Sequence, residues 1–512
     1  MRPSQSQRGL GKGEGGREGL VVASQNFSCM MTTQQDIFMV VTKQCDRVSV
    51  QVIFKILCVF IKKKLCEKIS TRTKQSRMHL IVFVVSLAVA KALMPPQITG
   101  FLHPKNTTTT SGLFYWVHPA VHESPDPATT PLVVWLQGGP GASSLLGALF
   151  ENGPFRLQEN GPLVQNATVN PFSWNDKANL VFIDQPFGTG YSYGAEEDLV
   201  TSMDEMAKWL NLALVELAET HPGFAGGKDR PLWLTGESYA GKYVPFLATE
   251  IMAQDGELAK RLQLGGLCIG DGWTEPATIV STYPAFAYSH GLVDDMQRQA
   301  MEANVTLFKQ AMDAGDYETA TDIERGIEHF VSAVAGTNAY DVRRFGDYDF
   351  SAAAAWLARD DVSKALGVDG LPAWNLASDK VNAALHAEVV LPASQLVAPL
   401  LKDHGLRVLF YNGMFDLDCN ILGTLEWMHA AVPELAAAER KQWFVAQTQA
   451  HTESPEGAPA GAPAGYAKSV GSFTQLTLTG AGHMVPMDVP AVALAMINKV
   501  MEGGEFGDEE TS

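Results

Sequence analysis

A short serine motif that follows an apolar run constrains the fold of this chain more than any other feature. The run Pro231-Leu232-Trp233-Leu234 leads into Thr235-Gly236-Glu237-Ser238-Tyr239-Ala240-Gly241. A strand that ends in Gly-x-Ser-x-small and turns directly into a helix presents its serine hydroxyl at the end of a sheet. Only small residues fit beside so sharp a turn, and Gly236 and Ala240 meet that need. The motif predicts an α/β fold with Ser238 as a candidate nucleophile.

A nucleophilic serine needs a general base, and the base needs an acid that orients it. In folds with this turn, the acid and the histidine follow the serine in that order. His483 lies in a glycine-rich loop just after the alternating apolar segment 473–478. A strand candidate at 407–412 leads to Asp416 and Asp418. Spacing alone leaves either aspartate as the acid.

Four sequence blocks resemble signatures of the serine carboxypeptidase family and occur in the order typical of that family. They are Trp135-Leu136-Gln137-Gly138-Gly139-Pro140-Gly141 with Glu151-Asn152-Gly153-Pro154 after it, Asp184-Gln185-Pro186-Phe187-Gly188-Thr189-Gly190-Tyr191-Ser192, the serine motif, and Gly482-His483-Met484-Val485-Pro486. The resemblance covers residues 100–501. Gln137 and the later Ile269-Gly270-Asp271-Gly272-Trp273 look most like the vitellogenic-like branch.

This resemblance implies an α/β-hydrolase fold, in which a central, mostly parallel sheet carries an inserted, mainly helical cap. It implies a serine-type carboxypeptidase that releases C-terminal amino acids from peptides and proteins at acidic pH through an acyl-enzyme. The substrates are then peptide or protein C-termini, and no cofactor or metal is needed.

The resemblance also implies roles for individual residues. Ser238 is the nucleophile, His483 the general base and acid, and Asp416 the orienting acid, because Asp416 precedes Cys419 by three residues as the family's aspartate precedes a cysteine. Asp418 is then expected to be a solvated loop carboxylate. The remaining assignments are an oxyanion hole from the N–H groups of Gly139 and Tyr239, recognition of the substrate carboxylate by Gln137, Gly138, Glu151 and Glu237, and a specificity pocket that includes Leu146, Phe150, Cys419 and Met484.

Two glutamates can recognise a carboxylate only if they hold protons. Like charges that lie close together raise each other's pKa, so a pair of glutamates keeps protons at mildly acidic pH and donates hydrogen bonds. We therefore expect cleavage of free-acid peptides to be best near about pH 5. Esters and peptide amides lack the carboxylate and should keep their rate at higher pH.

Charge divides the chain near its start. The formal net charge is −18, yet residues 1–77 hold 14 Lys and Arg against 5 Asp and Glu, which leaves −27 for the rest. So acidic a body argues against nucleic acid as a partner. Residues 78–92 have basic residues upstream, an apolar centre and an Ala-x-Ala end, which is typical of a secretory signal peptide. We interpret 1–77 as a basic extension from a mispredicted start, or less favourably as a membrane anchor over 48–61, and 93–512 as the hydrolase domain.

Other features bear on the processing of the chain. Four of the six cysteines precede residue 67, which leaves Cys268 as a predicted core thiol and Cys419. The family commonly has a paired cysteine where this chain has Ala142, so that bridge is absent. Sequons at Asn106, Asn166 and Asn304 are compatible with glycosylation in a secretory route to a lysosome, a vacuole or the outside. Helical patterns favour a cap over about 274–391, and the Gly-, Ala- and Pro-rich segment 454–471 is expected to be a flexible surface loop.

Two alternatives remain open. The same triad passes an acyl group to an alcohol in carboxypeptidase-like acyltransferases, although the set of Gln137, Glu151 and Glu237 favours peptides. The chain would otherwise be a protective partner protein on the same fold. The mature form is expected to be free of membrane, and a homodimer is left open.

Overall fold

The computed structural model of the chain describes residues 97–104, 111–163, 165–253, 258, 260–445 and 462–507. The basic extension at 1–77, the signal peptide at 78–92 and the sequon at Asn106 lie outside these residues. Among the helices that are described, none has the length and apolarity that crossing a membrane requires.

Ten of the described strands form one mixed sheet in the order β1-β2-β6-β3-β7-β8-β9-β12-β11-β10. The six strands from β6 to β12 in this order pair in parallel, and two antiparallel strands extend the sheet at each edge. The bounds are β1 (Ile98–Leu102), β2 (Leu113–His118), β3 (Leu132–Leu136), β6 (Asn179–Ile183), β7 (Pro231–Glu237), β8 (Gln263–Gly270), β9 (Arg407–Gly413), β10 (Lys441–Trp443), β11 (Gly465–Val470) and β12 (Phe473–Leu478), with a separate hairpin of β4 (Phe155–Arg156) and β5 (Thr168–Val169).

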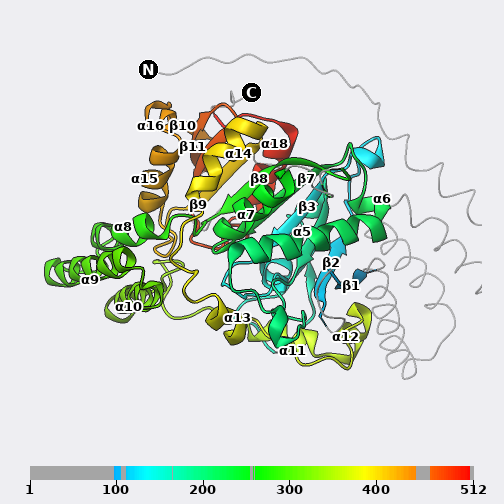
Figure 1. Cartoon of the computed structure of the whole chain (residues 1–512), viewed down its shortest axis with the longest axis horizontal. Helices are drawn as coiled ribbons and strands as arrows, with labels where there is room; N and C mark the ends of the chain where they lie inside the picture. Colours follow the sequence, from blue (N-terminus) through cyan, green and yellow to red (C-terminus); the bar gives the residue numbers. More distant parts are fainter. Residues whose placement is uncertain are drawn as a thin grey trace, which may run out of the picture. The chain divides into compact units, whose positions relative to one another are not determined.

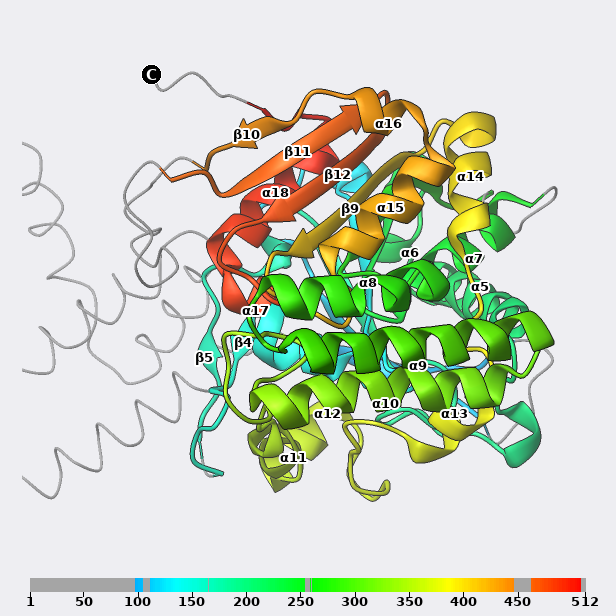
Figure 2. The same cartoon turned by 90° about the vertical axis from the view of Figure 1, so that its left-hand side faces the viewer.

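Helices flank the sheet on both sides. Figure 2 shows α5, α7 and α14 on one side of the strands and α18 on the other. Their bounds, with those of the remaining elements outside the cap, are α5 (Met203–Thr220), α6 (Pro222–Ala225), α7 (Ala240–Met252), α14 (Val397–His404), α15 (Ile421–Ala431), α16 (Glu434–Ala437), α17 (Val485–Asp488) and α18 (Pro490–Glu502), and the short turns η1 (Pro127–Thr129), η2 (Gly147–Glu151), η3 (Trp174–Asp176), η4 (Glu196–Asp198) and η5 (Ser394–Leu396). This arrangement is the α/β-hydrolase fold predicted from the sequence.

A mainly helical segment lies between β8 and β9. It contains α8 (Pro276–Ser289), α9 (Asp295–Ala314), α10 (Tyr317–Ala335), α11 (Ser351–Leu357), α12 (Asp360–Leu366) and α13 (Asp379–Ala384). Helices α8, α9 and α10 run side by side in both views (Figures 1 and 2). A capping box between Asp294 and Gln297 begins α9, and left-handed Gly315 and Gly336 end α9 and α10.

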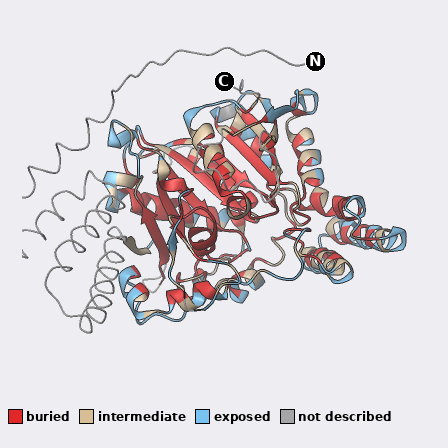
Figure 3. Cartoon of the chain, turned by 180° about the vertical axis from the view of Figure 1, so that it is seen from behind, coloured by how far each residue is buried: buried red, intermediate tan, exposed pale blue. Residues whose placement is uncertain are grey.

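The core forms because the parallel strands are apolar on both faces. All five residues of β3, Leu-Val-Val-Trp-Leu, are buried, and helices on both sides of the sheet require this composition. Figure 3 shows the buried strands and the exposed residues on the outer helices. Burial of each large side chain contributes about 1.5–3 kcal/mol before conformational entropy is counted.

The prediction of a flexible surface loop over 454–471 is wrong for residues 465–470, which the structure describes as a strand. Residues Gly465–Val470 form β11, which pairs antiparallel with β12 and with β10. The alanine- and glycine-rich composition concealed a strand whose early residues alternate between buried and half-buried positions. Its hydrogen-bond partners are distant in the chain, so local composition could not reveal it.

Candidate active site

Ser238 occupies the sharp turn between β7 and α7, as the motif predicts. Its φ of 63° lies in the left-handed region, which a serine adopts only where the surrounding chain holds it. The Ser238 N–H donates to the Gly270 carbonyl at 3.0 Å, and the Trp273 N–H donates to the Ser238 carbonyl at 2.8 Å. A Cβ on Gly236 would lie 2.3 Å from the Leu136 carbonyl oxygen, so the turn requires glycine there. The hydroxyl of half-buried Ser238 therefore stands at the carboxyl end of the sheet.

Asp416 and His483 meet after two neighbouring parallel strands, β9 and β12. Nδ1 of His483 lies 2.9 Å from Oδ2 of Asp416, which also accepts the Cys419 N–H at 3.2 Å. Both side chains are buried. Burial alone would lower the pKa of His483, but the charge and hydrogen bond of Asp416 outweigh burial and hold that pKa above its ordinary value. The imidazole is thus oriented as a base needs, although the described residues include no hydrogen bond between Ser238 and His483.

Asp418 is not the solvated loop carboxylate that we expected. It is half-buried, accepts a hydrogen bond from the Tyr283 hydroxyl at 3.2 Å, and lies 3.7 Å from the Cys419 sulfur. Burial raises the pKa of Asp418 to about 6. The cap covers this loop through α8 and α10, and local sequence gave no sign of that contact.

The two N–H groups expected to form an oxyanion hole lie beside the serine turn. A Cβ on Gly138 would lie 2.5 Å from the Tyr239 nitrogen, so the glycine block approaches the turn closely. Gly139 has a φ of 111°, which favours glycine. Among the described hydrogen bonds outside helices and strands, neither the Gly139 nor the Tyr239 N–H donates to a backbone carbonyl. Both donors are therefore free to face a developing oxyanion.

Gln137, Glu151 and Glu237 form one buried polar cluster. Nε2 of Gln137 donates to Oε1 of Glu237 at 2.9 Å, and the Trp135 indole N–H donates to Oε1 of Gln137 at 3.0 Å. Both carboxyl oxygens of Glu151 and Oε2 of Glu237 are buried without a hydrogen-bond partner in the described structure. Burial raises the pKa of Glu151 to about 7, and burial and then the charge of Glu151 raise that of Glu237 well above its ordinary value. Both shifts favour the protonated carboxyl groups in mildly acidic solution.

The four residues expected to line a specificity pocket are all buried. Leu146 directly precedes the turn η2, and Phe150 belongs to it. The centroid of the Phe150 ring lies 4.8 Å from that of the Phe350 ring. Cys419 and Met484 adjoin the proposed acid and base, and each is at most 3% exposed. Cys419 and Cys268 are free thiols, and Cys268 is the buried core thiol that we predicted.

The described sequons are accessible. Asn166 is exposed, and its side-chain oxygen accepts from Arg359 at 3.0 Å. Asn304 is exposed on α9, and its Nδ2 donates to the Ala300 carbonyl at 3.0 Å.

Sequence reasoning gave no role to three groups that contact the site. The Tyr340 ring stacks on His483 with 4.4 Å between ring centroids. Asp271 is buried against Asp416, and its position directly after β8 was the signal that could have revealed it. The third group is Glu324 on α10, which with Glu328 and Asp418 forms one of two described clusters compact enough to share an ion, the other being Asp416, Cys419 and His483.

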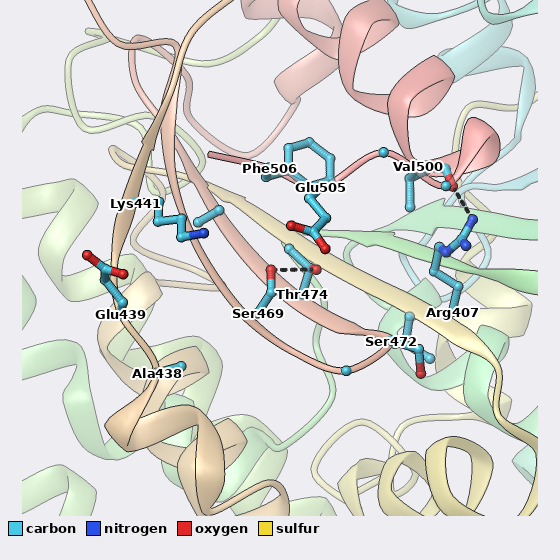
Figure 4. Close-up of a pocket in the computed structure, with 15 residues that line it drawn as sticks. Arg407, Ala438, Glu439, Lys441, Ser469, Ser472, Thr474, Val500, Glu505 and Phe506 are labelled. Atoms are coloured by element: carbon cyan, nitrogen blue, oxygen red, sulfur yellow. Dashed lines mark hydrogen bonds between the residues drawn. The ribbon is translucent and has the colours of Figure 1, made fainter. Parts of the chain in front are cut away.

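A cavity of about 550 Å³ lies at the amino ends of β9 and β12 (Figure 4). Its lining includes Arg407, Val408 and Thr474, which stand at the amino ends of β9 and β12, with Lys441 and Glu505 nearby. The proposed triad lies at the carboxyl ends of those strands, so the cavity belongs to a different region.

Comparisons with known proteins agree with this geometry. A sequence model of the serine carboxypeptidase family matches residues 89–503. The chain is 32% identical over 433 residues to "Serine carboxypeptidase S10 family member 1" of Dictyostelium discoideum, covering 82% of this chain and 97% of that protein. It is 33% identical to "Venom serine carboxypeptidase" of Apis mellifera, covering 80% of this chain and 84% of that protein.

A solved structure shows the same fold. It is that of KEX1(DELTA)P, a prohormone-processing carboxypeptidase of Saccharomyces cerevisiae, with a TM-score of 0.69, 24% identity, and coverage of 81% of this chain and 92% of that chain. The family match over most of the chain and the relatives above 30% identity lead to one conclusion. The chain belongs to the serine carboxypeptidase family, whose members are hydrolases of the exopeptidase type.

Proposed function

We propose that this chain removes C-terminal residues from peptides at acidic pH by means of an acyl-enzyme on Ser238. His483 takes the proton of the Ser238 hydroxyl as the oxygen attacks the scissile carbonyl, and Asp416 holds the imidazole through its Nδ1 hydrogen. The N–H groups of Gly139 and Tyr239 receive the oxyanion. His483 then returns the proton to the leaving amine, and a water molecule deacylates Ser238 by the same route.

One observation carries the choice of an exopeptidase. The buried cluster of Gln137, Glu151 and Glu237 contains carboxyl oxygens without partners, next to the serine turn. A protonated carboxyl pair donates hydrogen bonds to a substrate carboxylate, whereas an ionised pair repels it. Because burial raises the pKa of Glu151 to about 7 and that of Glu237 well above its ordinary value, binding of the free C-terminus is expected to be present in acid and to be lost as pH rises.

The test compares matched substrates that differ only at the C-terminus. A blocked dipeptide with a free carboxylate and the same dipeptide as its amide are assayed between pH 4.5 and 8. We expect kcat/KM for the free acid to fall with rising pH while that for the amide is retained. The same pH profile for both substrates would contradict the proposed carboxylate site.

A Ser238→Ala variant separates hydrolysis from other roles. We expect this variant to fold and to lose peptidase activity, because the attacking oxygen is gone. If the wild type transferred the acyl group of an activated ester to an added alcohol in preference to water, the chain would be an acyltransferase. If Ser238→Ala retained a stabilising effect on a partner enzyme, the fold would have a protective role.

We also propose that the chain enters the secretory route and carries glycans at Asn166 and Asn304. Both side chains are exposed, as an acceptor must be. Removal of N-linked glycans from protein secreted by a eukaryotic host should lower its mass, and Asn166→Gln and Asn304→Gln should each remove part of that shift. An unchanged mass would contradict the glycans.

A further inference from the structure

Asp271 lies at the centre of the site without a role in the chemistry described above. It follows β8 directly, as Ser238 follows β7, and its side chain is fully buried. Its φ of 42° lies in the left-handed region, which aspartate, asparagine and glycine tolerate best. The Asp271 N–H donates to the Tyr411 carbonyl at 2.8 Å, and Oδ1 accepts the Gly413 N–H at 2.9 Å. Two strands thus fix the position of this carboxyl group.

Asp271 and Asp416 each have one buried carboxyl oxygen without a hydrogen-bond partner in the described structure. Oδ2 of Asp416 accepts from His483 and from the Cys419 N–H, whereas its Oδ1 is buried without a partner in the described structure. Oδ2 of Asp271 is likewise buried without a partner. The two side chains interact directly. Buried oxygens rarely lack partners, and one shared proton satisfies both of these.

We propose that Asp271 is a positioning residue that stays protonated in the working enzyme and donates a hydrogen bond from Oδ2 to Oδ1 of Asp416. This inference rests on the proposed triad. Asp271 does not touch the substrate. It acts through Asp416, whose carboxylate it holds in the orientation that keeps the Nδ1 hydrogen of His483 bound.

The charged surroundings favour the neutral form of Asp271. Burial, and then the charge of Asp416, hold the pKa of Asp271 well above its ordinary value. The titratable groups that face it are Asp416, Glu237, Asp488, Tyr411 and Cys419. All five are carboxyl, phenol or thiol groups that add negative charge or none, and the Gly413 N–H, which favours an ionised Asp271, has a smaller effect than burial and the charge of Asp416.

Two substitutions at this position separate hydrogen bonding from charge. Asp271→Asn keeps an oxygen for the Gly413 N–H and supplies a permanent N–H for Asp416, and asparagine tolerates the same φ. Asp271→Gly also tolerates that φ but leaves Oδ1 of Asp416 unpaired. Rates are normalised to the number of competent sites by a serine-directed organophosphate titration run to completion. Peptide amides are the substrates, so that the Glu151 and Glu237 pair does not enter the pH profile.

The two variants should differ in a defined way. We expect Asp271→Asn to keep kcat within about threefold, and Asp271→Gly to lower kcat about 10- to 100-fold with little change in KM. The acid limb of kcat/KM, which reports the ionisation of His483, should move by less than about 0.3 pH unit in Asp271→Asn. Such a profile follows only if the residue that was replaced was already neutral.

Several results would overturn the inference. A fall of the acid limb by about one pH unit in Asp271→Asn would mean that Asp271 is ionised in the wild type. Wild-type kcat in Asp271→Gly, or equal losses in both variants, would mean that the hydrogen bond does not matter. Ser238→Ala is assayed in parallel, because activity there would reject the proposed triad itself, whereas an inactive Ser238→Ala with wild-type Asp271 variants would reject only the role of Asp271.

Discussion

Single residues decide the proposed specificity of this chain. The Gln137 amide has a fixed orientation, because it hydrogen-bonds to both Trp135 and Glu237, so the proposed carboxylate site has a preset geometry. Because burial is the largest cause of the raised pKa of both Glu151 and Glu237, the site depends on remaining dry.

Replacing both Glu151 and Glu237 by glutamine removes the two carboxyl groups that titrate in the proposed carboxylate site. In the double variant Glu151→Gln/Glu237→Gln, the ratio of kcat/KM for a free-acid peptide to that for its amide should be independent of pH. In the wild type this ratio should fall up to about tenfold for each pH unit once the pair begins to lose its proton. A double variant with the wild-type slope would show that another group governs the pH dependence.

Gly138 lies so close to the serine turn that a larger residue there should displace it. Its added Cβ in Gly138→Ala would meet the Tyr239 nitrogen at 2.5 Å and the Ser238 Cβ at 2.7 Å, so the serine turn must move. A displaced oxyanion donor costs about 100- to 1,000-fold in kcat, which steady-state kinetics measures directly. Gly326→Ala on α10 is the control, since its Cβ meets nothing within 4 Å and should leave kcat unchanged while stabilising the helix by up to about 1 kcal/mol. Full activity in Gly138→Ala would contradict the proposed oxyanion hole.

At the scale of elements, the cap rests on the active-site loop through acidic groups. Glu324 on α10 is buried, and its Oε1 lies 3.4 Å from the Tyr283 hydroxyl of α8, which also lies 3.2 Å from Oδ1 of Asp418. Burial, and then the charge of Asp418, raise the pKa of Glu324 well above its ordinary value. We therefore expect the contact between the cap and the active-site loop to depend on pH.

We predict that Glu324→Gln flattens the dependence of stability on pH. A carboxyl group whose pKa is raised in the folded state stabilises the protein most below its unfolded pKa, near about 4.3, and this contribution is lost as pH rises towards the folded pKa. The loss reaches about 1.4 kcal/mol per pH unit within that window. Thermal unfolding at pH 5 and pH 8 should show a smaller difference in Tm for Glu324→Gln than for the wild type.

The exposed Glu318 on the same helix provides the matched control. Glu318→Gln should keep the wild-type difference in Tm between the two pH values. The same flattening in both variants would mean that general charge, and not the buried contact, sets the slope.

At the scale of the whole molecule, buried acids with raised pKa values are spread over the domain. Burial raises the pKa of Asp184 to about 6, although Asp184 accepts from the Ser143 hydroxyl at 2.6 Å, and Glu151, Glu237 and Asp271 share the direction of this shift. Buried His118 opposes them, because burial lowers its pKa to about 3. A histidine of this kind reduces stability as pH falls below its unfolded value.

We therefore predict that the protein is more stable at pH 5 than at pH 8, since more groups lose stabilisation on the alkaline side, as these buried acids do, than on the acid side, where burial lowers the pKa of His118, His221 and His429. Scanning calorimetry of the Ser238→Ala variant, which prevents self-digestion, gives the Tm at each pH under constant salt. A Tm that increases from pH 5 to pH 8 would contradict this balance of buried groups.

Local patterns in the sequence were sufficient for the parts of the molecule that depend on neighbours in the chain. The apolar run before Ser238 is β7, and the alternating segment before His483 is β12. These elements follow from residues that lie next to one another, and the order of the serine, the acid and the histidine follows from the order of the strands.

Tertiary contacts decided the rest. Strand β11 exists because β12 and β10 pair with it, Asp418 is half-buried because α8 covers it, and Asp271 meets Asp416 only because β8 and β9 are neighbours in the sheet. By itself the sequence determined the family, the fold class and the turn that exposes Ser238. Only the folded chain decided which acids are buried together, because desolvation and hydrogen bonding arise from groups far apart in the sequence, and these fix which carboxyl groups hold a proton.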